Sequence, residues 1–285
     1  MKDLLGYREL RKNLEKLFIE SGITEFADID WIMVEITGKS RSMLQFIEQF
    51  SSEEINKIMS AVEMRIKHIP LAYIFGKSYF YGREFKTNEN VLIPRQDTEV
   101  LIEKICEDIN NQKREVSVLD IGTGSGAIAI TIQKETSAKL TAVDVSEKAI
   151  EVACENAKLL GVEVEFIQSD LFENVTGKFD FIVSNPPYIE TSVIETLESE
   201  VKDNEPILAL DGGLDGLDFY KKIVTDAPNY LNKGGKLYFE IGYNQAEDLK
   251  TLMNKEYKNI KIYKDYGNND RVVVGELLWL KDLEK

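Results

Sequence analysis

Apolar side chains recur at helical spacing through the first 76 residues. A period of three or four positions is seen in two stripes, Leu10, Leu14, Leu17 and Phe18 and then Ile29, Ile32, Met33 and Ile36. Gly38 follows the second stripe as a helix stop. Ser51 and Glu54 have the spacing of a capping box ahead of a third stripe. Little of this stretch alternates with period two, so we expect a small helical domain over residues 1–76.

Aromatic residues then flank a glycine turn. Residues 79–87 read Tyr-Phe-Tyr-Gly-Arg-Glu-Phe-Lys-Thr, a pattern typical of a β-hairpin, and we assign residues 77–93 to a hairpin linker. Asp97 and Thr98 are residue types that favour helix N-caps, and we expect them to open the next helix. One face of that helix is apolar, through Ile102, Ile105, Cys106 and Ile109.

From residue 116 onward the pattern changes to short apolar strands separated by helices. Five strands are predicted, at 116–121, 140–144, 164–167, 179–183 and 236–241. The clearest helix between them runs from Ala149 to Leu160, with Gly161 as its stop. Residues 260–263 and 271–275 are typical of an antiparallel edge pair. Such alternation favours a parallel sheet with helices on both faces, so we expect a Rossmann-like, seven-stranded α/β domain over residues 94–285.

Charge and one rare residue type remove several classes of function. The chain has 285 residues, and its 50 Asp and Glu against 35 Lys and Arg give a net charge of −15. Proteins that grip nucleic acid through its phosphates usually present a basic face, so nucleic acid is disfavoured as a partner. His68 is the single histidine. Histidine-rich zinc sites and catalytic triads therefore lack most of their parts, and we expect no metal.

The two cysteines, Cys106 and Cys154, are too few for a zinc cluster or a disulfide framework. Each lies in a helical pattern, where a buried small apolar residue is the expected role. The start of the chain lacks the features of a signal peptide, and no window approaches the roughly 20 apolar residues of a membrane span. We therefore expect a cytoplasmic protein without membrane contact.

A glycine-rich turn, Gly122-Thr123-Gly124-Ser125-Gly126, follows the strand at 116–121. Glycine permits close approach of a ligand, and backbone donors at the next helix N-terminus face that ligand. Asp144 ends the following strand, where its carboxylate can accept both hydroxyls of a ribose. The pattern fits either a dinucleotide or S-adenosylmethionine. Asp120 favours the methyl donor, because a carboxylate there attracts a cationic amino-acid group and repels a pyrophosphate.

The segment Asn185-Pro186-Pro187-Tyr188 comes directly after the strand at 179–183 and Ser184. Ligands of open α/β sheets bind beyond the carboxyl ends of the strands, so this segment should lie beside the glycine turn. The Asn185 side-chain oxygen and the Pro186 carbonyl can accept both hydrogens of a planar amino group, and Tyr188 offers a flat face for stacking. Two such acceptors favour a more tetrahedral nitrogen with its lone pair toward a sulfonium methyl. Positioning and electrostatics then suffice without a histidine base.

Together, the segments 120–126 and 185–188 resemble the amino-methyltransferases that use S-adenosylmethionine. Within them, the chain resembles the bacterial protein-(glutamine-N5) methyltransferases that modify peptide chain release factors. Further segments carry this narrower resemblance, at 70–76, 92–99, 205–206, 209–210, 212–213, 215–217, 240–242 with Gln245, and 270–273. The resemblance therefore extends over nearly the whole chain. Gln96, Leu171 and Asn204 depart from the family pattern, which concerns the packing around substrate and adenine and not the reaction.

The resemblance implies a class I methyltransferase domain preceded by a helical substrate-recognition domain. It implies methyl transfer from S-adenosyl-L-methionine to the glutamine of the Gly-Gly-Gln motif in class 1 release factors, with S-adenosyl-L-homocysteine as product. By that analogy residues 122–126 cradle the donor, Asp144 holds its ribose, and Asp170 and Leu171 flank its adenine. The segment 185–188 binds the glutamine amide, and Asn185 contacts the donor as well. Arg95 either pairs with Glu99 or contacts substrate.

Three alternatives stay open from the residues alone. A nucleic-acid adenine N6-methyltransferase uses the same tetrapeptide, although the net charge and the lack of a Lys/Arg-rich recognition segment weigh against it. A nicotinamide dehydrogenase fits the glycine turn, and a catalytically silent binding module fits the fold. The residues favour a planar amino group as acceptor without choosing glutamine over adenine. We expect the protein to act as a monomer.

Overall fold

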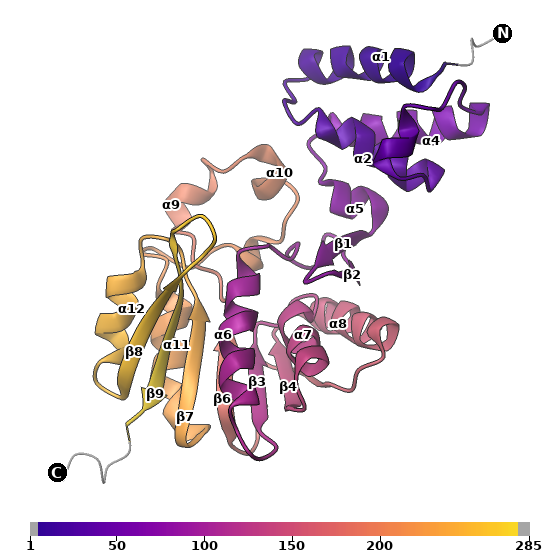
Figure 1. The fold of residues 1–285 in the computed structure, drawn as a ribbon. Coiled ribbons are helices and arrows are strands. Elements are labelled where there is room, and N and C mark those ends of the chain that lie inside the picture. The colour runs from indigo at the N-terminus through magenta and orange to yellow at the C-terminus, as the bar shows by residue number, and fades with distance from the viewer. Residues whose placement is uncertain (1–4, 279–285) are drawn as a thin grey trace. The chain divides into compact units, whose positions relative to one another are not determined.

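The computed structural model describes residues 5–278, and its internal contacts divide the chain into two compact units (Figure 1). The first, here called the helical unit, runs to Gly76 and also includes Ser199–Asn204. The second, the sheet unit, comprises Lys77–Glu198 and the chain from Glu205 onward. The sequence pattern assigns residues 199–204 to the methyltransferase domain, whereas their contacts group them with the helices of the first unit.

The helical unit consists of short helices around one apolar core. They are α1 (Tyr7–Glu20), α2 (Ala27–Thr37), α3 (Arg41–Leu44), α4 (Ser52–Arg65), α5 (Leu71–Phe75) and α10 (Ser199–Lys202). The expected caps are present: the Glu54 carboxylate accepts from the Ser51 amide at 2.7 Å, and the Ser51 hydroxyl accepts from the Glu54 amide at 3.2 Å. Gly38 ends α2 in the left-handed conformation, with φ of 66°.

Polar contacts join the segment Ser199–Asn204 to the other helices of this unit. The Arg65 guanidinium is only 3% exposed and pairs at 2.7 Å with both Asp28 and Glu200. The Asn204 side-chain amide donates to the His68 carbonyl at 3.1 Å. Asn204 is one of the residues that depart from the family pattern, and here it makes a contact that a side chain without an N–H donor would not provide.

The sheet unit contains a seven-stranded sheet in the order β5-β4-β3-β6-β7-β9-β8, which confirms the predicted class I fold. Its strands are β3 (Ser117–Ile121), β4 (Lys139–Asp144), β5 (Glu165–Gln168), β6 (Phe179–Ser184), β7 (Leu231–Glu240), β8 (Tyr257–Lys264) and β9 (Asp270–Leu277). The first five strands in that order pair in parallel, and β9 pairs antiparallel with both β7 and β8. The central strands are buried on both faces, as is typical of parallel sheets between helices.

Alternate residues of each strand enter separate hydrophobic clusters on the two faces of the sheet. Val118 belongs to the cluster of α6 (Thr98–Asn110), α7 (Ala127–Glu135) and α8 (Glu147–Leu160). Leu119 belongs to that of α11 (Asp218–Asp226) and α12 (Ala246–Met253). The remaining short elements are α9 (Thr191–Ile194), η1 (Ile207–Ala209) and η2 (Ala227–Asn229). Helices therefore cover both faces, as expected (Figure 1).

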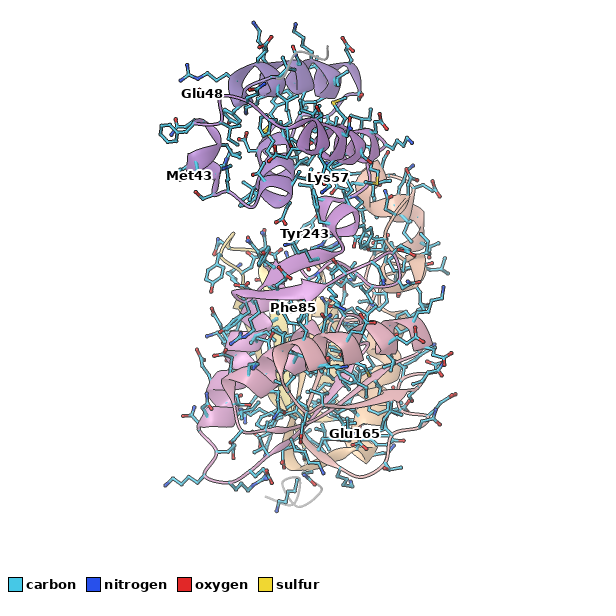
Figure 2. The ribbon with its side chains drawn as sticks, turned by 90° about the vertical axis from the view of Figure 1, so that its right-hand side faces the viewer. Met43, Glu48, Lys57, Phe85, Glu165 and Tyr243 are labelled. Atoms are coloured by element: carbon cyan, nitrogen blue, oxygen red, sulfur yellow. The ribbon has the colours of Figure 1, made fainter. Side chains whose placement is uncertain are left out.

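The predicted hairpin is formed by β1 (Lys77–Phe80) and β2 (Arg83–Lys86), which pair antiparallel around Gly82. Phe80 and Phe85 are buried in the cluster of α6 and α7. Figure 2 labels Phe85 on the hairpin and Glu165 on the edge strand β5. The hairpin thus packs as part of the sheet unit, which gives its apolar residues a core to enter.

Helix α6 begins at Thr98 with Asp97 at its N-cap position, as expected, although the Asp97 side chain makes no capping hydrogen bond within the described chain and pairs with Arg271 at 3.1 Å. The expectation for one of the two cysteines is wrong. Cys154 is exposed, because it lies on the outer face of α8, whereas Cys106 is buried and its burial raises the pKa of the thiol to about 12. Every helix among residues 5–278 is too short or too polar to cross a bilayer.

Gly161 provides a test of the backbone at the end of α8. Its φ is 64°, and a Cβ built on it would touch no other described atom within 4 Å. Gly161→Ala should lower the free energy of unfolding by about 1 kcal/mol through backbone strain alone, and Gly161→Asn by less. Urea denaturation measures both. Equal stability of the alanine variant and the wild type would contradict this account of the helix stop.

Candidate active site

The glycine turn leaves strand β3 at Ile121 and enters α7 at Ala127. Gly122, Gly124 and Gly126 all have positive φ, at 73°, 55° and 80°. A Cβ on Gly126 would lie 2.8 Å from the Ile130 side chain, so this glycine allows close packing of the helix. A Cβ on Gly122 or Gly124 would meet no described atom within 4 Å. These two glycines therefore open their backbone to a cavity, as a ligand-binding turn requires.

Asp144 ties the glycine turn to the end of β4. Its carboxylate accepts from the Gly124 amide and from the Ser146 amide, each at 2.9 Å. Burial raises the pKa of this carboxyl, while the backbone donors oppose that rise. The Ser146 hydroxyl in turn accepts from the Ala149 amide at 3.2 Å and caps α8. The carboxylate expected to hold a ribose is thus held by two backbone hydrogen bonds.

Asp120 lies beneath the turn and is completely buried. One carboxylate oxygen accepts from the Thr123 hydroxyl at 2.6 Å, and the other, Oδ1, has no hydrogen-bond partner within residues 5–278. Burial raises the pKa of Asp120 to about 7, and the nearby Asp144 carboxylate adds to the rise. An unpartnered buried carboxylate oxygen is costly, and Asp120 does not itself line the cavity formed by residues 5–278, so it would attract a cationic ligand only from behind Thr123 and the turn.

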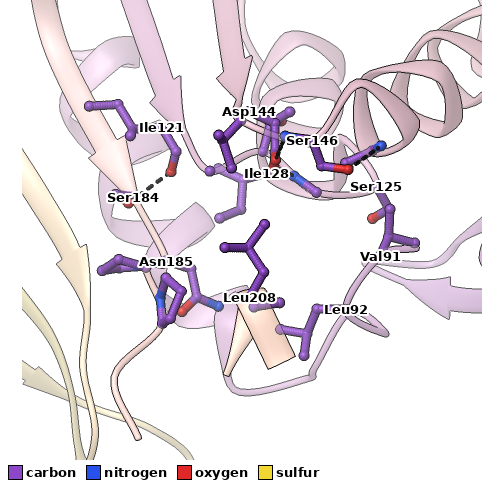
Figure 3. A pocket seen from close by; sticks show the side chains of 18 of the residues that line it. Val91, Leu92, Ile121, Ser125, Ile128, Asp144, Ser146, Ser184, Asn185 and Leu208 are labelled. Carbon is purple, nitrogen blue, oxygen red and sulfur yellow. Dashed lines mark hydrogen bonds between the residues drawn. The ribbon is translucent and has the colours of Figure 1, made fainter. Parts of the chain in front are cut away.

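The tetrapeptide 185–188 lies at the same edge of the sheet. Strand β6 lies beside β3, and the Ser184 hydroxyl donates to the Ile121 carbonyl at 2.8 Å, which joins the two strand ends. Asn185, Pro186 and Pro187 line one cavity together with Gly122, Gly124 and Asp144. Figure 3 shows Asn185 and Asp144 toward opposite sides of this cavity. The structure therefore brings the two motifs together.

Tyr188 is placed differently from its neighbours. Its half-buried ring packs against the cluster beneath α11 and α12, burial raises the pKa of its hydroxyl to about 12, and it does not line the cavity of the described chain. Its carbonyl accepts from the Gln245 amide at 3.1 Å. Gln245 also donates to the Gly216 carbonyl and accepts from the Gly242 amide. Gln245 thus holds the chain path after the two prolines.

The rest of the cavity is mainly apolar. Asp170 and Leu171, after β5, form part of its wall, and their expected role beside the adenine stays a prediction. Sequence reasoning missed several other wall residues, chiefly Val91, Leu92, Ser146, Leu208 and Phe219. Only Leu92 and Ser146 had a signal, since the first lies in a segment that resembles the family and the second follows Asp144. The others reach the cavity through the folding of long connections.

Arg95 and Glu205 form an ion pair at the cavity wall, and the Glu205 side chain is almost fully buried. Of the two alternatives for Arg95, pairing with Glu99 is not seen in the described chain, and the Glu99 carboxylate accepts from the Tyr81 amide at 2.9 Å. Thr98, the first residue of α6, also lines the cavity, and its hydroxyl lies 3.5 Å from the Asn185 side-chain nitrogen. The start of α6 thus forms part of the site.

Comparisons with known proteins agree with this geometry. The family model "Methyltransferase small domain" matches residues 95–215. A methyltransferase structure from Pyrococcus furiosus aligns with a TM-score of 0.53 at 19% identity, over 80% of this chain and 98% of that one, which is a likeness of fold. The fold and the glycine turn with Asp144 are those of a class I methyltransferase that uses S-adenosylmethionine.

The narrower family follows from the sequence relatives. The model "PrmC N-terminal domain" matches residues 9–76. A release factor glutamine methyltransferase of Fusobacterium nucleatum is 44% identical over 87% of this chain and 72% of its own length. One of Bacillus subtilis is 38% identical over 89% and 92%. The chain belongs to the release factor glutamine methyltransferase family.

A comparison of Gly124→Ala with Gly161→Ala should separate the effect of blocking ligand approach from the effect of backbone strain. The added methyl group meets no described protein atom but occupies the open side of the turn. We expect S-adenosylmethionine affinity to fall at least about ten-fold, measured by calorimetric titration. Gly161→Ala is the matched control, because it carries a similar strain at φ of 64° and lies outside the cavity. Equal affinities of the two variants would contradict this role of the turn.

Asp120 should make donor binding depend on pH. Its pKa of about 7 means that the carboxyl gains a proton as pH falls through neutrality, and the attraction for a cation is then lost. The dissociation constant for S-adenosylmethionine should rise about ten-fold between roughly pH 8 and pH 6. Titrations across that range measure this, with Asp120→Asn as the control whose affinity is low and flat. The same pH dependence in that variant would refute the assignment.

Proposed function

We propose that this enzyme transfers a methyl group from S-adenosyl-L-methionine to the side-chain amide nitrogen of glutamine in the Gly-Gly-Gln motif of class 1 peptide chain release factors. The observation that carries the proposal is that Asn185 and Pro186 line the same cavity as Gly122, Gly124 and Asp144. A donor site and a site for a planar amide therefore share one space. Membership of the release factor glutamine methyltransferase family supports this choice of amide.

The residues at the glycine turn fit the donor. Open backbone at Gly122 and Gly124 admits its amino-acid end, and Asp120 with Thr123 provides negative charge there. Asp144 accepts the ribose hydroxyls, while Asp170 and Leu171 flank the adenine. Thr123, Ser125 and Gly126 complete the cradle as part of the same turn. When bound, S-adenosylmethionine supplies a methyl group on a cationic sulfur.

The acceptor amide needs alignment because its nitrogen lone pair is delocalised into the carbonyl. The Asn185 side-chain oxygen and the Pro186 carbonyl accept its two hydrogens and so favour a nitrogen with an available lone pair. Two consecutive prolines fix the backbone at 186 and 187, and Gln245 holds the Tyr188 carbonyl. In the described packing Tyr188 contributes to this fixed chain path, and we propose that its ring forms the edge of the amide site.

The alkylated nitrogen is far more acidic than the starting amide, so its proton can leave to water and a histidine base is unnecessary. His68 belongs to the helical unit, where its carbonyl accepts from Asn204. We propose that the helical unit contributes to binding the release factor. It exposes apolar side chains suited to a protein partner, namely Trp31, Met43 and Phe46.

We further propose that the enzyme works as a monomer in the cytoplasm, on protein and not on nucleic acid or at a membrane. The net charge of −15 disfavours phosphate backbones and anionic lipid surfaces alike. Adenine N6 methylation is the rival for the same tetrapeptide. Methyl transfer to bare DNA or RNA, with a steep dependence on salt, would favour that rival.

The proposed reaction is tested by mass spectrometry of intact release factor after incubation with enzyme and donor. We expect one added methyl group on the Gly-Gly-Gln glutamine and none when that glutamine is replaced by alanine. Asn185→Ala should slow the reaction by on the order of 10²-fold, because the amide loses an acceptor that aligns it. Asn111→Ala is the control, since Asn111 is exposed just beyond α6. An unmethylated release factor with the wild-type enzyme would reject the substrate.

A further inference from the structure

The orientation of the Asn185 amide decides whether this residue can accept a hydrogen bond from a substrate. An asparagine side chain presents an oxygen on one side and an NH₂ group on the other, and only the oxygen suits a substrate N–H. We propose that Glu240, acting with Thr98, is a positioning residue that holds the Asn185 amide with its oxygen toward the cavity. This inference rests on the function proposed above.

Strand register places Glu240 beside Asn185. Strands β6 and β7 run parallel with Ser184 opposite Phe239. The residues that follow these two in the sequence, Asn185 and Glu240, therefore lie beside each other. Phe239 belongs to the cluster of α11 and α12, and alternation turns the following residue to the other face. Helix α6 covers that face and begins at Thr98. Three elements thus bring Thr98, Asn185 and Glu240 to one point.

The hydrogen bonds among these residues have one consistent direction. The Thr98 hydroxyl and the Asn185 side-chain amide both lie near the Glu240 carboxyl and lower its pKa, and a carboxylate can only accept, so the donor hydrogens of both groups turn toward it. A hydroxyl has one hydrogen, so Thr98 that donates to Glu240 presents only lone pairs to Asn185, whose nitrogen lies 3.5 Å away. Both neighbours are then acceptors toward Asn185. They bind its NH₂ group and leave its oxygen for the cavity.

A role in stability alone does not account for this carboxylate. Glu240 is 1% exposed and Thr98 is 4% exposed, and Oε2 of Glu240 has no hydrogen-bond partner within residues 5–278. A buried carboxylate with an unsatisfied oxygen costs stability that a well-packed apolar residue avoids. The nearby cation, Arg271, pairs with Asp97 and Asp265. A positioning role gives the carboxylate a function that an apolar residue does not supply.

Protonation would change the Glu240 carboxyl from a hydrogen-bond acceptor into a hydrogen-bond donor. Burial raises the pKa of this carboxyl to about 7, and the charged or titratable groups that face it are Asp97, Tyr188, Tyr220 and Arg271. Below that pH the carboxylic acid can donate to the Asn185 oxygen, which is then no longer available to substrate. Turnover at saturating donor should therefore fall as pH decreases through about 7.

The test compares Glu240→Gln, Thr98→Val and Thr98→Ser with the wild type, using intact release factor, saturating S-adenosylmethionine and mass-spectrometric detection. Glu240→Gln and Thr98→Val should lower kcat by about 10- to 100-fold, because each removes part of the fixed orientation. The KM for release factor and the affinity for the donor should stay within about three-fold of wild type. Thr98→Ser keeps the hydroxyl and should restore most of kcat. Glu276→Gln, which alters a carboxylate on β9 paired with Lys258, is the matched control.

The outcomes separate this inference from the proposed function. A wild-type enzyme that leaves release factor unmethylated rejects the function and the inference together. Methylation by the wild type with unchanged kcat in both Glu240→Gln and Thr98→Val rejects only the inference. A parallel loss of kcat, donor affinity and thermal stability would show a structural role and reject it as well. Glu240→Gln should also lose the fall of kcat below about pH 7; if that fall persists, Glu240 does not control the orientation. Should Glu240→Gln fail to fold, Thr98→Val decides.

Discussion

Strand β3 is paired on both sides by parallel strands, and the site depends on that pairing. Its last residue, Ile121, lies opposite Val143 of β4 and Ser184 of β6. Because parallel strands end at the same edge, the segments that follow them meet there: the glycine turn, Asp144 and the Asn-Pro-Pro-Tyr tetrapeptide. The hydrogen bonds from Gly124 to Asp144 and from Ser184 to Ile121 then fix the distances between these segments. Catalytic alignment is thus a consequence of strand register.

Buried carboxylates are the second feature of this part of the structure. Asp120, Asp144 and Glu240 are carboxylates whose burial raises the pKa of each. Such groups destabilise a protein unless something compensates them, and binding sites are where such compensation by a ligand is common. The enzyme has one histidine and places it in the helical unit. No histidine lines the cavity of the described residues.

Much of the architecture could be predicted from sequence pattern because the relevant signals are local. The short apolar runs of the central strands, the Ser51–Glu54 capping box and the glycine stops at Gly38 and Gly161 each depend on residues a few positions apart. Local pattern does not decide between two possible partners of one side chain. Asp97 stands at the N-cap of α6, but its carboxylate pairs with Arg271, and Arg95, for which Glu99 was one of two alternatives, pairs with Glu205. Competition between local and distant partners is settled only by packing.

The sequence by itself indicated the class of sheet, the glycine turn with its acidic partner and the Asn-Pro-Pro-Tyr tetrapeptide, because glycine, proline and carboxylate at those spacings have few other uses, but it left the choice between glutamine and adenine as acceptor open. Tertiary structure decided the rest. Long connections bring Leu208 and Phe219 to the cavity, and the chain after the tetrapeptide sends Ser199–Asn204 into the helical unit. Glu240 lies in a segment that resembles the family, but a single acid at a strand end is common and no local pattern indicates a role for it beside Asn185. The role of Glu240 follows only from the strand register that places it beside Asn185 and from the position of Thr98, and no local sequence pattern contains either.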